Sequence, residues 1–176
     1  MSTSVSTEPV ATGIPGTELA NALRALGVTH VICVPDTMQK TAIDSLAATA
    51  PPELLYVCTE DEGIGINAGL YITGHQPMLL IQNNGLYACI NTLKAIALDA
   101  QVPTFMLIGQ YGRDPLLTPD ASPRRAVNRL EPTLQAWNVP FERIEGPADL
   151  PKLRAMWDRS RSTKGPAAAI VGAATI

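Results

Sequence analysis

The chain has 176 residues, of which 46% are hydrophobic and 16% charged, as is typical of one globular domain with a substantial core. Its net charge of −3 argues against a nucleic-acid-binding surface, and no apolar run reaches the roughly 18–20 residues that span a membrane. We therefore expect neither nucleic acid nor a membrane among its partners.

The first residues are rich in Ser and Thr and lack the cationic and apolar pattern of a secretion signal. We expect a flexible tail over residues 1–13 and a single domain over residues 14–176. We also expect a cytoplasmic location.

Strand-like and helix-like segments alternate along the rest of the chain. Apolar, β-branched runs predict strands at residues 28–34, 53–58, 78–82, 102–109, 140–144 and 165–172. Helical spacing of apolar residues predicts helices at residues 17–26, 38–49, 60–74, 86–99, 124–138 and 148–162. Pro132 must kink or split the fifth helix, residues 83–85 predict a sharp turn, and residues 110–123 predict a polar loop.

Repeated strand–helix units with continuously apolar strands are typical of a parallel sheet that is covered on both faces. We predict a three-layer α/β/α fold with a six-stranded, mostly parallel sheet. Ligands bind such sheets at the carboxyl ends of the strands, so the turns at residues 34–37, 58–62 and 82–85 and the loop after residue 109 are the places to search for a site.

Cysteine and histidine usage gives no sign of a metal site. Cys33, Cys58 and Cys89 are odd in number, form no CxxC motif and lie in or beside apolar runs, so we expect buried free thiols. His30 and His75 show no ligand spacing with each other or with a cysteine. We predict no metal bound by this chain alone.

Three acids follow the apolar run that ends at Cys58, which the pattern predicts to be a buried strand. Thr59 and Glu62 fit a capping box, and Asp61 gains from the dipole at a helix start. Glu60 stands at the first helical position. The dipole alone explains Glu60, but a functional role at a strand end explains it as well, and composition leaves both open.

The segment "TEDEGIGINAGLYITGHQPMLLIQNNGLYACINTL" carries a wider pattern. Glu60 is followed by Gly69 and Tyr71, then by a strand that ends in "QNNGL" at residues 82–86, then by "NTL" at residues 91–93. This pattern resembles the pyrimidine-binding (Pyr) domain of thiamine-diphosphate-dependent decarboxylases. Within that superfamily it is most similar to the α subunit of sulfopyruvate decarboxylase and to the matching half of phosphonopyruvate decarboxylase. The resemblance runs from about residue 16 to residue 112.

The resemblance implies roles for individual residues. Glu60 is implied as the catalytic glutamate that hydrogen-bonds N1′ of the cofactor's aminopyrimidine ring, and the cofactor-binding residues are implied as Glu60, Gln82, Asn84, Gly85 and Leu86. The implied substrate-binding residues are Asp36, Asn84, Tyr87 and Arg113. Arg113 would hold a sulfonate, phosphonate or carboxylate, because a guanidinium suits such oxyanions.

Each of these positions also has a simpler explanation. Residues 83–85 are explained by an Asn-Gly turn. Asp36 or Thr37 is explained as a helix cap, and Arg113 is explained as a solvated surface residue. Two positions depart from the family pattern. Tyr87 and Ala88 replace a small Gly-Asn pair, and Gly112-Arg113 reverses an Arg-Gly pair, which leaves the substrate open.

Thiamine diphosphate requires a second domain with a Gly-Asp-Gly motif, and this sequence has none. The resemblance therefore implies a separate β subunit, with a PP domain that holds the diphosphate and Mg²⁺, and a site shared between the chains. The expected function is the α (Pyr) subunit of a 2-oxo acid decarboxylase that converts sulfopyruvate to sulfoacetaldehyde and CO₂. The alternatives are phosphonopyruvate or another 2-oxo acid, a carboligation, or a non-catalytic flavodoxin-like binding module.

Overall fold

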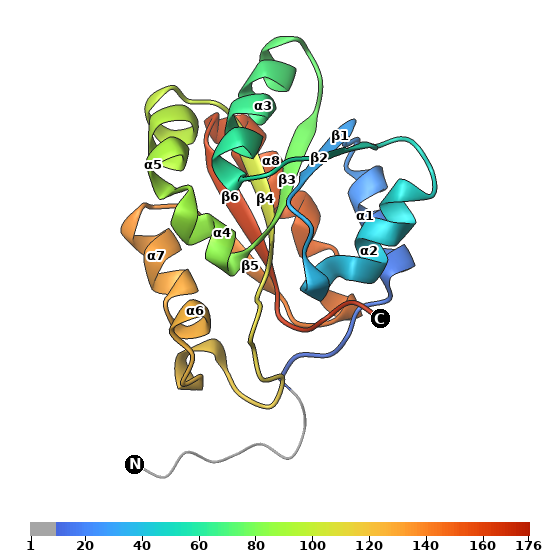
Figure 1. Ribbon diagram of the computed structural model, residues 1–176, viewed down its shortest axis with the longest axis vertical. Coiled ribbons are helices and arrows are strands. Elements are labelled where there is room, and N and C mark those ends of the chain that lie inside the picture. Colours follow the sequence, from blue (N-terminus) through green and yellow to red (C-terminus); the bar gives the residue numbers. More distant parts are fainter. Residues whose placement is uncertain (1–9) are drawn as a thin grey trace.

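The computed structural model describes residues 10–176 as a six-stranded sheet between two layers of helices (Figure 1). The strand order is β2-β1-β3-β4-β6-β5, and every neighbouring pair is parallel. The strands are β1 (His30–Cys33), β2 (Glu53–Tyr56), β3 (Pro77–Gln82), β4 (Thr104–Gly109), β5 (Phe141–Ile144) and β6 (Pro166–Val171). The predicted α/β class, the number of strands and their places in the chain are confirmed.

Helices cover both faces of the sheet. One face carries α1 (Gly16–Ala25), α2 (Lys40–Ala47) and α8 (Lys152–Thr163). The other carries α3 (Glu60–Ile72), α4 (Asn83–Ala88), α5 (Ile90–Thr92), the π-helical segment η2 (Leu93–Asp99), α6 (Arg125–Asn128) and α7 (Leu130–Ala136). Short 3-10 turns complete the chain at η1 (Thr37–Gln39), η3 (Pro119–Ala121) and η4 (Pro147–Asp149).

The core has two halves, one on each side of the sheet. Strands β4 and β6 are buried along their whole length, because helices cover them on both faces. On the α8 side, Phe105 meets Trp157 edge-on, with ring centroids 5.7 Å apart. On the opposite side, Ile64, Leu86 and Leu134 pack against the sheet with less than 2% of their surfaces exposed. This core holds the carboxyl ends of the strands in fixed register.

Two local predictions need correction, and a third is confirmed. β2 is an edge strand with half-exposed residues, so the run before Glu60 is not a central, buried strand. The segment at 83–85 is not a turn but the first turn of α4, and the predicted helix 86–99 is interrupted at Cys89. The prediction that Pro132 kinks or splits the helix at 124–138 is confirmed: the helix divides at Arg129, and Pro132 falls in the first turn of α7, where its missing N–H is tolerated.

The predicted tail at residues 1–13 lies outside the described residues up to residue 9. Beyond that point the chain is anchored: Val10 N donates to Pro115 O at 2.7 Å, and Thr12 N donates to Glu145 O at 2.6 Å. Ala11 between them is 2% exposed. The ordered part of the domain therefore begins before residue 14. No helix within residues 10–176 is long and apolar enough to cross a membrane.

The chain reverses its direction across the sheet between β1 and β3. From β1 it runs through α2, on one face, to the edge strand β2. From β3 it runs through α4 and η2, on the opposite face, to β4. Loops that diverge in this way open a crevice at the carboxyl ends of the two strands, which is where doubly wound sheets bind ligands. The turns after β1 and β3 are therefore the first place to examine.

Candidate functional site

Glu60 begins α3, and its carboxyl group lies against Gly85 in the first turn of α4. A Cβ atom on Gly85 would stand 1.9 Å from Glu60 Oε1 and 2.2 Å from its carboxyl carbon. Only glycine leaves room for this approach, so Gly85 is required for space and not for a turn. Glu60 is half-buried, and its carboxylate has no hydrogen-bond or ion-pair partner among residues 10–176.

The two neighbouring acids have separate positions. The backbone N–H of Glu62 donates to Thr59 Oγ1 at 3.3 Å, as the predicted capping box requires. The Glu62 carboxylate reaches back to the N–H of Cys58, at 3.0 Å, one residue earlier than the box predicts. Asp61 is exposed. Of the two acids that the cap does not use, Asp61 faces solvent and Glu60 is half-buried against α4.

A chain of side-chain hydrogen bonds crosses the crevice between β1 and β3. Gln82 Nε2 donates to Asp36 Oδ1 at 3.2 Å, and Asn84 Nδ2 donates to Gln82 Oε1 at 2.8 Å. Gln39, on η1, donates from Nε2 to Asp36 Oδ2 at 3.1 Å. The structure therefore brings three of the predicted site residues together, and Asn84, the outermost, is exposed.

Asn83 and Gln39 were not predicted as site residues. Asn83 is fully buried and donates from Nδ2 to the carbonyls of Tyr111 and Ala126, at 3.1 and 2.9 Å, and its Oδ1 accepts from Asn84 N at 2.9 Å. It ties the start of α4 to the loop after β4. Its position in the "QNNG" motif was the signal available for Asn83, whereas nothing in the sequence marks Gln39 as buried.

Two predicted ligand contacts are not supported by the geometry. Leu86, predicted to bind the cofactor, is 0% exposed and packs in the core beneath α4, so its side chain has no access to a ligand. Tyr87, predicted to bind substrate, turns its hydroxyl to the Ala126 carbonyl at 3.1 Å. Burial raises the pKa of Tyr87, while nearby Arg129 opposes that shift. Tyr87 holds α4 to α6.

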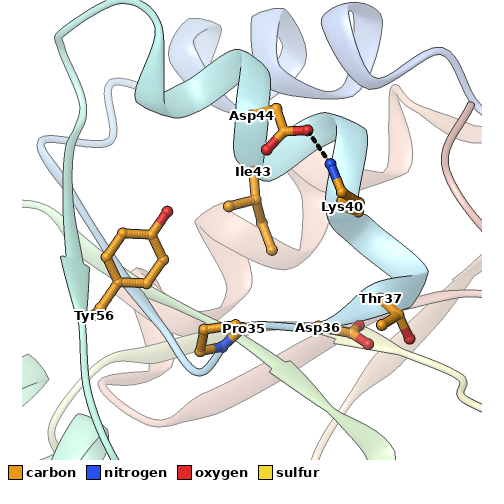
Figure 2. A pocket seen from close by; sticks show the side chains of 7 residues that line it. All are labelled: Pro35, Asp36, Thr37, Lys40, Ile43, Asp44 and Tyr56. Atoms are coloured by element: carbon orange, nitrogen blue, oxygen red, sulfur yellow. Dashed lines mark hydrogen bonds and ion pairs between the residues drawn. The ribbon is translucent and has the colours of Figure 1, made fainter.

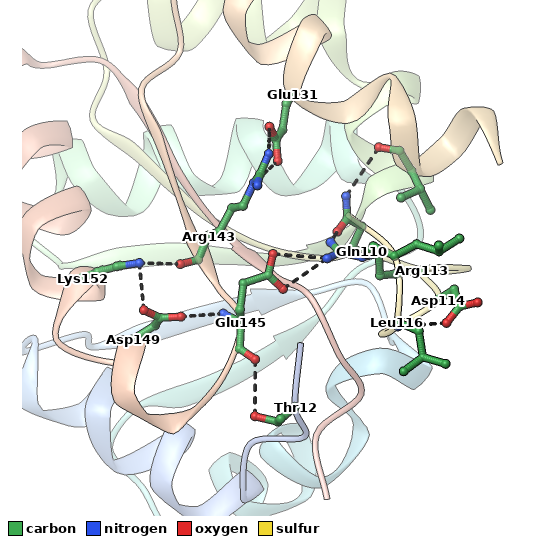
Figure 3. A network of polar contacts seen from close by, with 12 residues as sticks. Thr12, Gln110, Arg113, Asp114, Leu116, Glu131, Arg143, Glu145, Asp149 and Lys152 are labelled. Carbon is green, nitrogen blue, oxygen red and sulfur yellow. Dashed lines mark hydrogen bonds and ion pairs between the residues drawn. The ribbon is translucent and has the colours of Figure 1, made fainter. Parts of the chain in front are cut away.

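Arg113 is held by hydrogen bonds within its own chain, as Figure 3 shows, although it also lines a cavity of about 320 Å³ beside the loop after β4. Its guanidinium donates to Leu117 O at 2.9 Å, to Gln110 Oε1 at 2.7 Å and to Glu145 Oε1 at 3.3 Å. The side chain has 0% exposure, against 18% for Glu145. The predicted surface or substrate-binding arginine is instead the centre of a buried polar network, because Glu145 at the end of β5 supplies the opposite charge.

Three other arginines lie near the crevice and have no ion-pair partner among the described residues: Arg124, Arg125 and Arg129. All three are exposed. They flank Ala126, whose carbonyl accepts from Asn83. Arg124 lies over Gly112, where a Cβ would be 2.9 Å from its Cδ atom. Arg124 also lines a cavity of about 320 Å³ beside the loop after β4.

A second cavity, of about 330 Å³, opens on the α2 side of Asp36 (Figure 2). It is lined by Pro35, Asp36, Thr37, Lys40, Ile43, Asp44 and Tyr56. The Lys40 ammonium is 2.7 Å from Asp44, and this hydrogen bond raises the pKa of Lys40. Since the lysine is already paired, the cavity offers no free cation to an anionic ligand. Within residues 10–176, no three His, Cys, Asp or Glu side chains are placed to hold a metal ion.

Comparison with known proteins gives a consistent result, although no protein-family model matches the chain. It is 33% identical over 86 residues to sulfopyruvate decarboxylase subunit alpha of Methanococcus maripaludis, covering 49% of this chain and 52% of that one. It is 35% identical over 92 residues to sulfopyruvate decarboxylase of Methanosarcina acetivorans, covering 44% of this chain and 23% of that one. The matched region is therefore about half of the first relative and a quarter of the second.

A longer alignment, 24% identical over 128 residues, relates the chain to sulfopyruvate decarboxylase subunit alpha of Methanothermobacter thermautotrophicus, covering 72% of this chain and 76% of that one. The similarity to these subunits that the sequence pattern indicated is confirmed. Among solved structures, 2-oxoglutarate:ferredoxin oxidoreductase from Magnetococcus marinus superposes with a TM-score of 0.68 at 14% identity, over 92% of this chain and 29% of that one. That likeness establishes a shared fold.

Proposed function

We propose that the chain is the pyrimidine-binding α subunit of a thiamine-diphosphate-dependent 2-oxo acid decarboxylase, with sulfopyruvate as the leading substrate and sulfoacetaldehyde and CO₂ as products. The observation that carries the proposal is the Glu60 carboxylate, which has no partner among residues 10–176 and lies against Gly85 at the strand-crossover crevice. The similarity to sulfopyruvate decarboxylase α subunits supports the same assignment.

We propose that the turns after β1 and β3 take one half of the cofactor. Glu60 offers a carboxyl oxygen to a ring nitrogen, and the close contact with Gly85 holds that oxygen at the start of α4. Gln82 and Asn84 line the same edge with amide groups. When bound, thiamine diphosphate supplies the carbon nucleophile and the electron sink for decarboxylation. This chain supplies the carboxyl group that hydrogen-bonds the aminopyrimidine and can share a proton with it.

The other half of the cofactor falls to a partner in this proposal. We assign the diphosphate and its Mg²⁺ to a separate PP-domain β subunit, and the similarity to relatives named subunit alpha supports such a partner. The exposed side of α3 suits a protein contact, because Gly65 and Gly69 have nothing within 4 Å of a Cβ position and Ile72 is 77% exposed. Glycine inside a helix lowers the stability of the fold. Because no residue of this chain needs the space at Gly65 and Gly69, these glycines suit the close approach of a partner chain.

The substrate's second anionic group needs a cation, and Arg113 is fully engaged elsewhere. We propose that the exposed arginines beside α4, above all Arg124, take that role. Because Arg113 is paired with Glu145, a second candidate function is a 2-oxo acid without a second anionic group, such as pyruvate, that is decarboxylated or joined to an aldehyde, and phosphonopyruvate stays an alternative to sulfopyruvate. Assay of the complex with sulfopyruvate, phosphonopyruvate and pyruvate separates the two. A strong preference for sulfopyruvate that Arg124→Gln abolishes supports the first.

The test of the shared site is a native pull-down of the full chain with mass spectrometry of what accompanies it. We expect a second chain that carries Gly-Asp-Gly, at a fixed ratio. If the chain returns alone or with unrelated proteins, the decarboxylase proposal fails and the non-catalytic binding module takes its place.

A further inference from the structure

Gln39 has an unusual environment for a residue with no assigned role. Its side chain is 0% exposed, and its Nε2 donates both to Asp36 Oδ2 and to the Ile81 carbonyl, each at 3.1 Å. Its Oε1 is buried with no partner among residues 10–176. A buried acceptor without a partner lowers stability by about 1–3 kcal/mol, which an apolar residue of similar size would avoid. We therefore look for the role of Gln39 in its NH₂ group, which donates to Asp36 and to the Ile81 carbonyl.

The donors around Asp36 explain why this residue is a carboxylate. Oδ1 accepts from Met38 N at 3.0 Å and from Gln82 Nε2 at 3.2 Å, while Oδ2 accepts from Gln39 Nε2 at 3.1 Å. Both positions must hold an oxygen, because the Gln39 amide cannot turn over without placing its own oxygen against the Ile81 carbonyl. An asparagine at position 36 would place its NH₂ group against another donor in either orientation of its amide. Asp36 is 3% exposed, so water does not resolve such a conflict.

The same logic fixes the orientation of the next two amides. Because Asp36 only accepts, Gln82 must turn its NH₂ inward and its Oε1 outward. Oε1 then accepts from Asn84 Nδ2 at 2.8 Å, which sets the orientation of the Asn84 amide at the crevice. The sequence of bonds runs from a buried residue to an exposed one. Gly109, at the end of β4, leaves space for it, since a Cβ there would be 2.0 Å from Asp36 Oδ2.

We propose that Asp36 and Gln39 are positioning residues, which set the amide orientation of Asn84 through Gln82. Asp36 thereby acts through its neighbours and not by touching substrate, in place of the contact that the family resemblance implied. We call the hydrogen bonds from Gln39 through Asp36 and Gln82 to Asn84 the relay. The relay rests on the observed distances, whereas its effect on turnover rests on the proposed function. A ligand bound at Asn84 would meet an amide whose oxygen and nitrogen are held in fixed positions.

The test uses ¹⁵N-labelled full chain and the side-chain amide signals of Gln82 and Asn84. In Gln39→Met, a substitution of similar volume, we expect both signals to shift and the Gln82 amide hydrogens to exchange faster. Gln76→Met is the matched control, because Gln76 stands before β3, at the opposite end of the sheet. In the complex with its partner, kcat of Gln39→Met should fall by roughly tenfold to hundredfold with KM little changed, because the oriented group is displaced.

Gln82→Met provides a second reading if Gln39→Met does not fold. It interrupts the relay midway, so the Asn84 signals should move. Unchanged Asn84 signals in both variants, or in the one that folds, would overturn the relay. If the signals move as expected but the wild-type complex turns over no 2-oxo acid, the relay stands and the proposed function is the part that fails.

Discussion

Two polar clusters lie at the carboxyl edge of the same sheet, and they differ in how completely their groups are paired. Around Arg113 and Glu145, at the β4–β5 side, each of the three guanidinium nitrogens of the arginine has an acceptor in its own chain (Figure 3). Between β1 and β3, the Glu60 carboxylate has no partner among residues 10–176, and Asn84 is exposed. The first cluster fastens the loop after β4, and the second has bonding capacity left for a ligand.

The difference shows that residue type alone does not identify a binding residue. Arg113 has the chemistry of an anion-binding side chain, but Glu145 neutralises it and burial removes it from water. Glu60 has the chemistry of an ordinary helix-start acid, but Glu62 serves the cap and leaves Glu60 free. We propose that the unpaired Glu60 carboxylate, and not the fully paired Arg113, belongs to the ligand site.

The largest effect is expected on removing the acid of the open cluster. Glu60→Gln keeps the shape but loses the group that shares a proton, so kcat of the complex should fall by about 10²–10⁴-fold. Steady-state kinetics and gel filtration measure turnover and assembly together. Glu62→Gln, two residues away in the cap, is the control and should keep most activity. Equal losses in the two variants would contradict a special role for Glu60.

The closed cluster should respond in stability. Arg113→Met leaves the Glu145 carboxylate, which is 18% exposed, without its cation, so the free energy of unfolding should fall by roughly 3–5 kcal/mol. Urea denaturation of the full chain measures this. Arg124→Met, an exposed arginine without an ion pair, should change stability by less than about 0.5 kcal/mol. If Arg113→Met is as stable as the wild type and has a raised KM, the result would instead indicate that Arg113 binds substrate.

Gly85→Ala tests the contact that defines the open cluster. The new methyl group would overlap the Glu60 carboxyl group, which can move because it ends a flexible side chain. We expect kcat to fall by roughly tenfold to hundredfold through this displacement, with the unfolding midpoint nearly unchanged. A large loss of stability with normal kcat per folded molecule would show that Gly85 serves packing alone.

Gly65→Ala distinguishes an effect on the stability of the isolated chain from an effect on its association with a partner. Nothing lies within 4 Å of a Cβ at this position, so alanine should stabilise the isolated chain by about 0.5–1 kcal/mol. If the partner packs on α3 as proposed, the same methyl group should weaken the complex. Thermal unfolding and analytical ultracentrifugation give the two readings, and unaltered association would place the partner elsewhere.

The smallest effect concerns the thiols. Burial raises the pKa of Cys33 and of Cys89 to about 12, whereas Cys58 is exposed, so the prediction of a buried thiol is wrong for Cys58. Since the folded chain holds these two protons more tightly than the unfolded chain, their contribution to stability is full below the unfolded pKa of 9.0 and is lost as pH rises towards 12. Alkylation at pH 8 followed by mass spectrometry should modify Cys58 alone, and rapid labelling of all three would contradict the buried placement.

The sequence was sufficient for the architecture, because apolar strands and amphipathic helices alternate with clear periods. It also located Glu60, Gln82 and Asn84 at one edge, since carboxyl ends of parallel strands meet there. It did not foresee the burial of Arg113 and Leu86 or the contact of Tyr87 with Ala126, because burial and pairing depend on residues far away in the chain. Glu145 is 32 positions from Arg113, and no local pattern connects them. Gln39 was missed for the same reason.

The most direct test of the central claim is CO₂ release from sulfopyruvate by purified components, with each omitted in turn. The complete mixture contains this chain, the co-purified partner, thiamine diphosphate and Mg²⁺. We predict release only when both chains and the cofactor are present, and its loss with Glu60→Gln. Equal release by the partner alone, or none from the complete mixture with any 2-oxo acid, would contradict a shared site built on Glu60.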